Sequence, residues 1–221
     1  MTIREHHLPV RRTARYYTLG AEPAGAREIW FVCHGYGQLA ARFLRHFKSL
    51  DDGRRLIVAP EGLSRHYVER RPEPRVGASW MTREDRLHEI EDYVAYLDTL
   101  HTALVTQGAK PARTVALGFS QGVATTCRWA ARGTTPLTDL ILWGELPPPD
   151  LDLDAAAPAY QRLKLRLVIG RNDEFVTPDR LAVSEARLRR GGVPASTRLF
   201  EGGHEMDAAA LAAVAAEVSA G

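Results

Sequence analysis

Short apolar runs alternate with amphipathic segments along almost the whole chain of 221 residues, and this alternation restricts the fold more than any other feature. The runs at 29–33 (IWFVC), 114–118 (TVALG) and 165–169 (LRLVI) are almost uninterrupted by polar residues. Strands with one face in water alternate apolar and polar residues, whereas strands of a parallel sheet are covered on both faces and read as continuous apolar runs. The pattern therefore predicts an α/β fold with a mostly parallel central sheet and helices on both faces.

Strand and helix signals follow one another without a linker or an internal repeat. We expect strands at 15–19, 28–33, 54–59, 113–117, 139–143, 165–169 and 196–200, and helices at 38–50, 82–107, 121–132, 178–190 and 207–219. In the second helix Ile90, Val94 and Leu97 recur at helical steps and mark a buried stripe. Residues 1–221 should form a single domain. The longest connections, 60–81 and 146–164, are only about twenty residues each, which is too short for a large cap domain.

Composition excludes several classes of protein. With 45% hydrophobic and 25% charged residues the chain resembles an average globular protein. A formal net charge of +2 gives no general attraction to nucleic acid. The longest apolar run, 208–216, is too short for a membrane span, and the first fifteen residues lack the apolar core of a secretory signal. We therefore expect a cytoplasmic protein that binds neither nucleic acid nor a membrane.

A nucleophile motif follows the expected strand at 113–117. Gly118-Phe119-Ser120-Gln121-Gly122 is a G-x-S-x-G sequence placed between a strand and a helix. The two glycines let the strand and the helix approach closely, while the serine occupies the sharp turn between them. Such a turn exposes the hydroxyl at the helix N-terminus, where the helix dipole favours negative charge. Ser120 is therefore the predicted nucleophile.

A serine nucleophile needs a general base, and in enzymes with this turn the order along the chain is serine, acid, histidine. His204 is the one histidine after Ser120, and it follows the last expected strand. Asp173 follows the strand at 165–169 and is the predicted acid, which would orient the imidazole. Glu174 is the neighbour most easily confused with it. Less suitable, because they begin a strand or lie in a proline-rich loop, are Asp139, Asp150, Asp152 and Asp154.

The loop after the strand at 28–33 reads His34-Gly35-Tyr36-Gly37-Gln38. An acyl-transfer enzyme needs two hydrogen-bond donors directed at the developing oxyanion. We expect these to be the backbone N–H groups of Tyr36 and Gln121.

The same loop also supports a different class of function. Gly35-x-Gly37-x-x-Ala40 is a dinucleotide-binding pattern, with Glu61 after the next strand as its ribose partner. This pattern is weak by itself, and it leaves Ser120, Asp173 and His204 without a role. A hydrolase fold kept as a non-catalytic binding module is a second alternative.

From about Glu28 to its end the chain resembles the phospholipase/carboxylesterase family of α/β-hydrolases, which includes small bacterial esterases and acyl-protein thioesterases. The matching motifs are His34–Gly37, Ala78–Trp80, Gly118–Gly122, Glu145–Pro147, Gly170–Val176 and Gly203-His204. The resemblance implies a Ser120, Asp173 and His204 triad, with the Tyr36 and Gln121 N–H groups as oxyanion donors. The chain departs from the family at Gln38, at Thr177 and in the segment 59–62 (APEG).

The expected reaction is hydrolysis of a small carboxylic ester through an acyl-serine intermediate, with thioesterase or lysophospholipase activity as alternatives within the same family. Short connections predict an open site and acyl chains of short to medium length. The apolar residues nearest the relevant strand ends are Trp80, Met81, Leu146 and Phe175. No metal or nucleotide-phosphate motif occurs, so no cofactor and no metal are expected. The sequence leaves the oligomeric state open, a homodimer included.

Arginines make up 26 of the 29 basic residues, an excess that codon bias explains for most of them. The loop at 63–76 contains Arg65, Arg70, Arg71 and Arg75, and it follows a strand at the predicted catalytic end. Because a guanidinium group binds anions in a bidentate manner, Arg70 and Arg71 are included among the expected substrate contacts.

Overall fold

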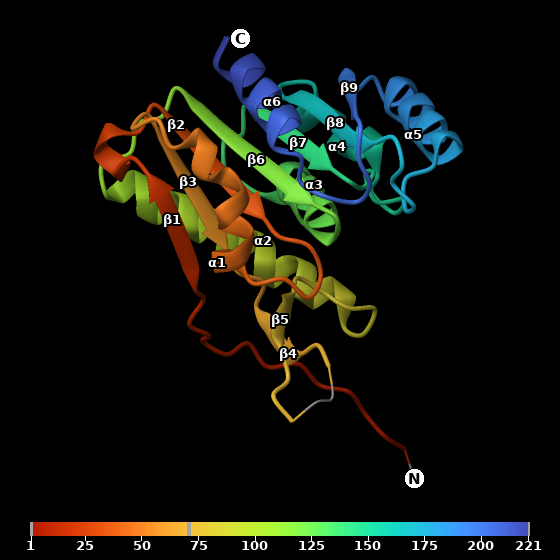
Figure 1. Cartoon of the computed structure of the whole chain (residues 1–221). Coiled ribbons are helices and arrows are strands. Elements are labelled where there is room, and N and C mark those ends of the chain that lie inside the picture. The colour runs from red at the N-terminus through yellow and green to blue at the C-terminus, as the bar shows by residue number, and fades with distance from the viewer. Residues whose placement is uncertain (1, 70–71, 221) are drawn as a thin grey trace.

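The computed structural model describes residues 2–69 and 72–220, and a seven-stranded sheet forms the centre of this part of the chain (Figure 1). The strands are β1 (Tyr16–Gly20), β2 (Glu28–Cys33), β3 (Arg55–Pro60), β6 (Arg113–Phe119), β7 (Asp139–Trp143), β8 (Lys164–Gly170) and β9 (Ala195–Phe200). Their order is β1-β3-β2-β6-β7-β8-β9, and every neighbouring pair is parallel except β1 with β3. The predicted α/β class is confirmed, and each expected strand segment lies in this sheet.

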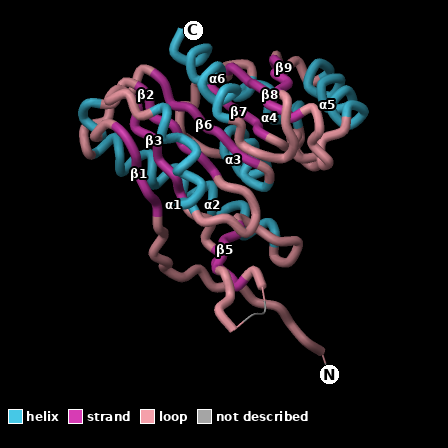
Figure 2. Tube along the Cα trace, in the orientation of Figure 1, coloured by secondary structure: helices cyan, strands magenta, loops and turns pink. Residues whose placement is uncertain are grey.

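Helices cover both faces of the sheet, as the continuous apolar runs predict (Figure 2). One face carries α2 (Arg86–Thr106), α3 (Gln121–Arg132), α4 (Leu153–Tyr160) and α5 (Pro178–Arg190), and the other carries α1 (Ala40–Phe43), the 3-10 helix η2 (Leu44–Leu50) and α6 (Ala208–Ala220). Side chains of β2 alternate between the two resulting cores: Ile29 and Phe31 enter the first, and Trp30 and Val32 the second. None of the described helices is long and apolar enough to cross a membrane.

The structure differs from the sequence prediction in the two long connections and at two helix starts. Residues 60–81 contain an antiparallel hairpin of β4 (Ser64–Tyr67) and β5 (Val76–Ser79). The proline-rich connection contains α4, whose first turn is stabilised because the Asp152 carboxylate accepts hydrogen bonds from two backbone N–H groups. The segment predicted as one helix at 38–50 divides into α1 and η2, and α2 begins at Arg86 instead of residue 82.

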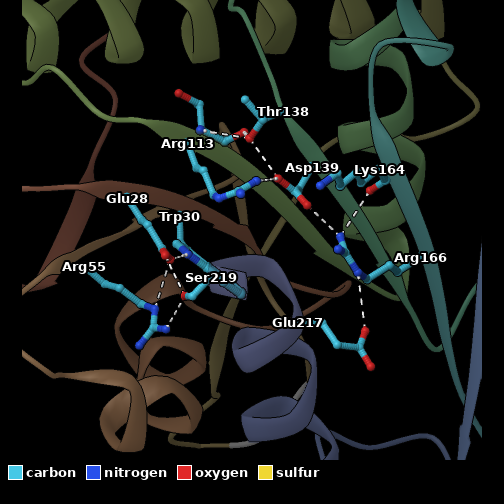
Figure 3. A network of polar contacts seen from close by, with 11 residues as sticks. Glu28, Trp30, Arg55, Arg113, Thr138, Asp139, Lys164, Arg166, Glu217 and Ser219 are labelled. Carbon is cyan, nitrogen blue, oxygen red and sulfur yellow. Dashed lines mark hydrogen bonds and ion pairs between the residues drawn. The ribbon is translucent and has the colours of Figure 1, made fainter. Parts of the chain in front are cut away.

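Polar contacts attach α6 to the amino ends of the strands (Figure 3). Glu28 on β2 accepts a hydrogen bond from the Ser219 hydroxyl at 2.6 Å. Asp139 at the start of β7 is fully buried and accepts from Arg166 at 2.7 Å, and Arg166 in turn lies 3.5 Å from Glu217 on α6. Charges buried in this way are tolerated because they are paired and hydrogen-bonded. Asp139 therefore belongs to a structural network at the amino ends of the strands. This edge of the sheet is opposite to the loops that contain Ser120, Asp173 and His204.

Candidate active site

Ser120 lies between the last residue of β6 and the first residue of α3. Its backbone adopts φ 53° and ψ −118°, one of two positive φ values among the described non-glycine residues. The turn is held because the Ser120 N–H donates to the Trp143 carbonyl at 2.9 Å and the Ser120 carbonyl accepts from Val123 N at 2.9 Å. A positive φ at a serine costs free energy and persists only where the surrounding structure enforces it. The turn places the side chain at the N-terminus of α3, as the motif predicts.

Gly118 and Gly122 permit three elements to meet at this turn. A Cβ atom on Gly118 would lie within 3.0 Å of the backbone of Gly122. A Cβ atom on Gly122 would lie within 3.0 Å of the carbonyl oxygens of Cys33 and His34. Only residues without a side chain fit at such distances, and the loop that follows β2 is thereby held against the start of α3.

His204 and Asp173 form the charged part of the site. The Nδ1 atom of His204 lies 2.9 Å from Oδ2 of Asp173, whose side chain is fully buried. The other carboxylate oxygen accepts from the N–H groups of Phe175 at 2.8 Å and Val176 at 3.3 Å. A carboxylate on Nδ1 selects the tautomer that leaves Nε2 free to accept a proton. Glu174, the alternative acid, has an exposed side chain, and the carboxylate that contacts His204 belongs to Asp173.

The loops after β8 and β9 bring these two residues together. Asn172 N donates to the Gly202 carbonyl at 2.9 Å. A Cβ atom on Gly170 would lie within 3.0 Å of the carbonyl oxygens of Gly202 and Gly203. Neighbouring strands therefore end in loops that touch, so that residues 31 positions apart in the chain meet.

Ser120 and His204 line the same pocket, which has a volume of about 420 Å³. The other residues around it are Gly35, Tyr36, Gln38, His46, Phe119, Phe175, Glu205 and Met206. The rings of Phe119 and Phe175 lie 5.0 Å and 4.6 Å from the His204 ring, centroid to centroid. Within the described residues, the Ser120 hydroxyl has no hydrogen-bond partner, so it is available to a ligand.

The loop after β2 contributes Gly35, Tyr36 and Gln38 to the lining of this pocket. The Gly35 carbonyl accepts from His34 Nδ1 at 2.8 Å and from Gln38 N at 3.3 Å. Because a trans peptide is planar, the N–H group of Tyr36 points in the direction opposite to that carbonyl. Considering residues 2–69 and 72–220, neither Tyr36 N–H nor Gln121 N–H donates to a protein acceptor.

His34 fixes the geometry of this loop. Its side chain is fully buried, its Nε2 accepts from Gly62 N at 3.0 Å, and its carbonyl accepts from Trp80 Nε1 at 2.9 Å. Burial lowers the pKa of His34, so the ring stays neutral at pH 7. A neutral ring that accepts at Nε2 must donate from Nδ1, which is the donor that the Gly35 carbonyl requires. The sequence prediction assigned no role to this histidine.

The side chain of Gln121 holds the segment that follows β5. Its Oε1 accepts from Trp80 N at 3.1 Å, and its Nε2 donates to the Met81 carbonyl at 2.9 Å. The amide group of Gln121 therefore connects the start of α3 to the segment after β5.

Of the four residues predicted to line an acyl pocket, three lie in or against the core and one lines the pocket that contains Ser120. Trp80 and Leu146 are buried in the core on the α2 and α3 face, and Met81 packs against that core. Trp80 turns inward because its indole N–H bonds to His34 and its ring meets Tyr93 edge to face. The structure places none of these three around the pocket that contains Ser120, whereas Phe175 is half exposed and lines it.

The arginine loop contributes no contact to this pocket in the described residues. Arg70 and Arg71 lie outside the described residues. Arg65 pairs with Glu61 at 3.3 Å, and Arg75 is exposed.

Glu61, the expected ribose partner of a bound dinucleotide, is almost fully buried. Its carboxylate already accepts from Arg15 at 2.6 Å and from Ala40 N at 3.3 Å. These contacts leave the carboxylate unavailable to a ribose hydroxyl and weigh against the dinucleotide alternative.

Several residues around the pocket carried no sequence signal. His46 lies on η2, and burial lowers its pKa, which favours the neutral ring. Helical spacing at 3.6 residues per turn does not give the direction of a side chain in a 3-10 helix, which has three residues per turn. Glu205 and Met206 belong to the loop after His204, where no periodicity places a side chain.

Comparison with known proteins identifies the fold. No protein-family model and no curated protein sequence matches the chain. Among solved structures, esterase PE8 is 22% identical with a TM-score of 0.70, covering 94% of this chain and 99% of that one. A carboxylesterase from Mesorhizobium loti is 19% identical with a TM-score of 0.71, covering 93% and 94%. Acyl-protein thioesterase 2 from Zea mays is 17% identical with a TM-score of 0.69, covering 94% and 99%. The chain thus has the α/β-hydrolase fold over nearly its full length.

Proposed function

We propose that this protein is a serine hydrolase of the phospholipase/carboxylesterase family that cleaves small carboxylic esters. The observation that carries the proposal is the convergence on one pocket of a serine with a strained, positive-φ backbone and a histidine paired with a buried carboxylate. A strained serine at a helix N-terminus has no evident structural purpose, whereas an acyl-transfer nucleophile requires that position. The shared fold with known esterases and a thioesterase supports the proposal.

In the acylation step Ser120 Oγ attacks the ester carbonyl carbon, and His204 Nε2 takes the hydroxyl proton. Negative charge then develops on the former carbonyl oxygen, where the N–H groups of Tyr36 and Gln121 would donate to it. The bond to the alcohol breaks as His204 returns the proton to the leaving oxygen. Asp173, through its contact with Nδ1, stabilises the imidazolium that exists between the two transfers.

Deacylation repeats these steps with water as the nucleophile. His204 takes a proton from water, and the resulting hydroxide attacks the carbonyl carbon of acyl-Ser120. The oxyanion of this second tetrahedral intermediate would accept hydrogen bonds from the same two N–H groups. The proton then passes to Ser120 Oγ as the carboxylic acid leaves. The net reaction consumes one water and yields an acid and an alcohol, so no cofactor takes part.

We propose that the substrates carry acyl chains of short to medium length. Its volume of about 420 Å³ includes the space around Ser120, and the side chains of Phe119, Phe175 and Met206 limit it. We expect kcat/KM for p-nitrophenyl esters to be highest for acetate to hexanoate and to decrease for longer chains. Thioesters of the same acyl groups, measured in parallel, will give the leaving-group preference. A rise in kcat/KM from hexanoate to palmitate would contradict this prediction.

Labelling with a fluorophosphonate probe tests the reaction class and the nucleophile together. The wild-type protein should be labelled stoichiometrically, and the Ser120→Ala variant should not be labelled, because the probe bonds only to an activated serine. Ser184→Ala, at a buried serine on α5 that does not line the pocket, is the matched control and should be labelled like wild type. Absence of labelling in a folded wild-type protein would contradict the proposal that the protein is a serine hydrolase. If such an unlabelled protein binds NAD, the dinucleotide alternative is supported. If it does not bind NAD, the non-catalytic binding module is supported.

A further inference from the structure

Three potential metal ligands meet at the protein surface away from Ser120. His7 Nε2 lies 3.2 Å and His88 Nδ1 lies 2.6 Å from the same oxygen, Oδ1 of Asp85. One ligand atom from each residue falls within 4.8 Å of the other two, and all three residues are exposed. The imidazole rings of the two histidines are 4.0 Å apart, centroid to centroid. None of the three takes part in the proposed hydrolysis.

The donor set matches the preferences of one class of ion. Two imidazole nitrogens and one carboxylate oxygen suit zinc and its first-row neighbours, which commonly bind three protein ligands with water in the remaining position. With metal–ligand bonds of about 2.0–2.2 Å, ligand atoms of a tetrahedral site lie about 3.3 Å apart. The His7–Asp85 distance of 3.2 Å already fits, and the His88–Asp85 distance would open by less than about 1 Å. We propose that His7, Asp85 and His88 bind a divalent transition-metal ion such as Zn²⁺.

The backbone at Asp85 supports this assignment. Asp85 precedes the first residue of α2 with φ 48° and ψ 34°, a left-handed conformation that is unfavourable for a residue other than glycine. An aspartate at this position usually accepts hydrogen bonds from the first N–H groups of the helix, but this carboxylate makes no such cap. It is directed instead at the two imidazoles. The strained turn therefore gives up a helix cap to bring the carboxylate to the histidines.

Metal binding would fasten the N-terminal segment, residues 2–15, to the body of the protein. At one end of this segment Arg15 pairs with the buried Glu61, and its carbonyl accepts from Tyr96 on α2. Near the other end, the contacts of His7 with Asp85 and His88 attach the segment to the start of α2. Between these points Leu8, Pro9, Val10, Arg12 and Ala14 form one wall of a pocket of about 680 Å³ against α2. Leu8 and Val10 are 82% and 78% exposed, so apolar packing alone holds them weakly.

Calorimetric titration of the full-length protein with ZnCl₂, after removal of bound metal with EDTA, tests the site. Wild type should bind about one Zn²⁺ per chain. His7→Ala and His88→Ala should each weaken binding roughly tenfold or more, because each removes one of three ligands. His6→Ala is the matched control: this exposed histidine lies next to His7 but outside the cluster, and its loss should leave the affinity unchanged.

Proteolysis gives a second readout that does not depend on esterase activity. Arg11 and Arg12 are exposed between the two attachment points, and Zn²⁺ should slow tryptic cleavage there in wild type but not in His7→Ala. The proposal is overturned if wild type binds no Zn²⁺, or if His7→Ala and His88→Ala bind it as wild type does. Because ester hydrolysis uses none of these residues, either result leaves the proposed function standing.

Discussion

Replacing His204 with alanine should lower kcat/KM for p-nitrophenyl acetate by about four to six orders of magnitude, the loss seen when the base of a serine triad is removed. The variant lacks Nε2, which we propose takes the Ser120 proton and returns it to the leaving alcohol. Fluorophosphonate labelling should be lost in the same variant, because the probe also needs an activated serine. The circular dichroism spectrum should not change, since Asp173 keeps its hydrogen bonds from Phe175 and Val176.

A second histidine in the same pocket provides the control for this experiment. His46 lines the pocket with Ser120 but has no carboxylate partner among the described residues, so His46→Ala should retain activity within about tenfold. Asp173→Asn should lie between the two, with a loss of about 10⁴, because an amide can donate to Nδ1 and favour the wrong tautomer. The assignment of His204 is wrong if His204→Ala keeps a tenth of wild-type activity, or if His46→Ala loses as much as His204→Ala.

The arrangement of the sheet was predictable because its strands are buried on both faces. The runs Ile29–Cys33 and Leu165–Ile169 are apolar because both faces of their strands are covered. That signal is readable in each run by itself, without knowing which strands pair with it. In a parallel sheet all strands end at the same edge, so motifs that follow three strands were expected to meet. The hydrogen bond between His204 and Asp173 and the shared pocket with Ser120 are the geometry expected from that argument.

The walls of the pocket depend on contacts that no local pattern encodes. Trp80 follows β5 of the small hairpin, in the connection after β3, yet its indole N–H donates to the His34 carbonyl and the ring is buried in the core. His46 reaches the pocket because the expected helix tightens into η2, which changes the direction of its side chains. The position of Trp80 depends on a contact with a residue distant in sequence, and the position of His46 depends on the local backbone geometry. Neither can be read from hydrophobicity or spacing.

Replacing Gly122 with alanine should destabilise the protein by at least about 3 kcal/mol, the upper part of the range for overpacked sites. The added methyl group would lie within 3.0 Å of the carbonyl oxygens of Cys33 and His34. These are backbone atoms of a central strand and of the loop that follows it, so they cannot move aside by a change of rotamer. The strand or α3 must shift as a whole, and the free energy of unfolding measured in urea should fall accordingly.

Gly25→Ala is the matched control, because a Cβ atom at Gly25 would meet nothing within 4 Å and its φ is not positive. That variant should remain within about 1 kcal/mol of wild type or be slightly more stable. Any folded Gly122→Ala protein should also lose activity, since moving α3 from the loop after β2 separates the N–H groups of Tyr36 and Gln121 that would bind the oxyanion. An unfolding free energy within about 1 kcal/mol of wild type would show that the β2 loop can retreat, and the close approach would then not be what holds the two donors together.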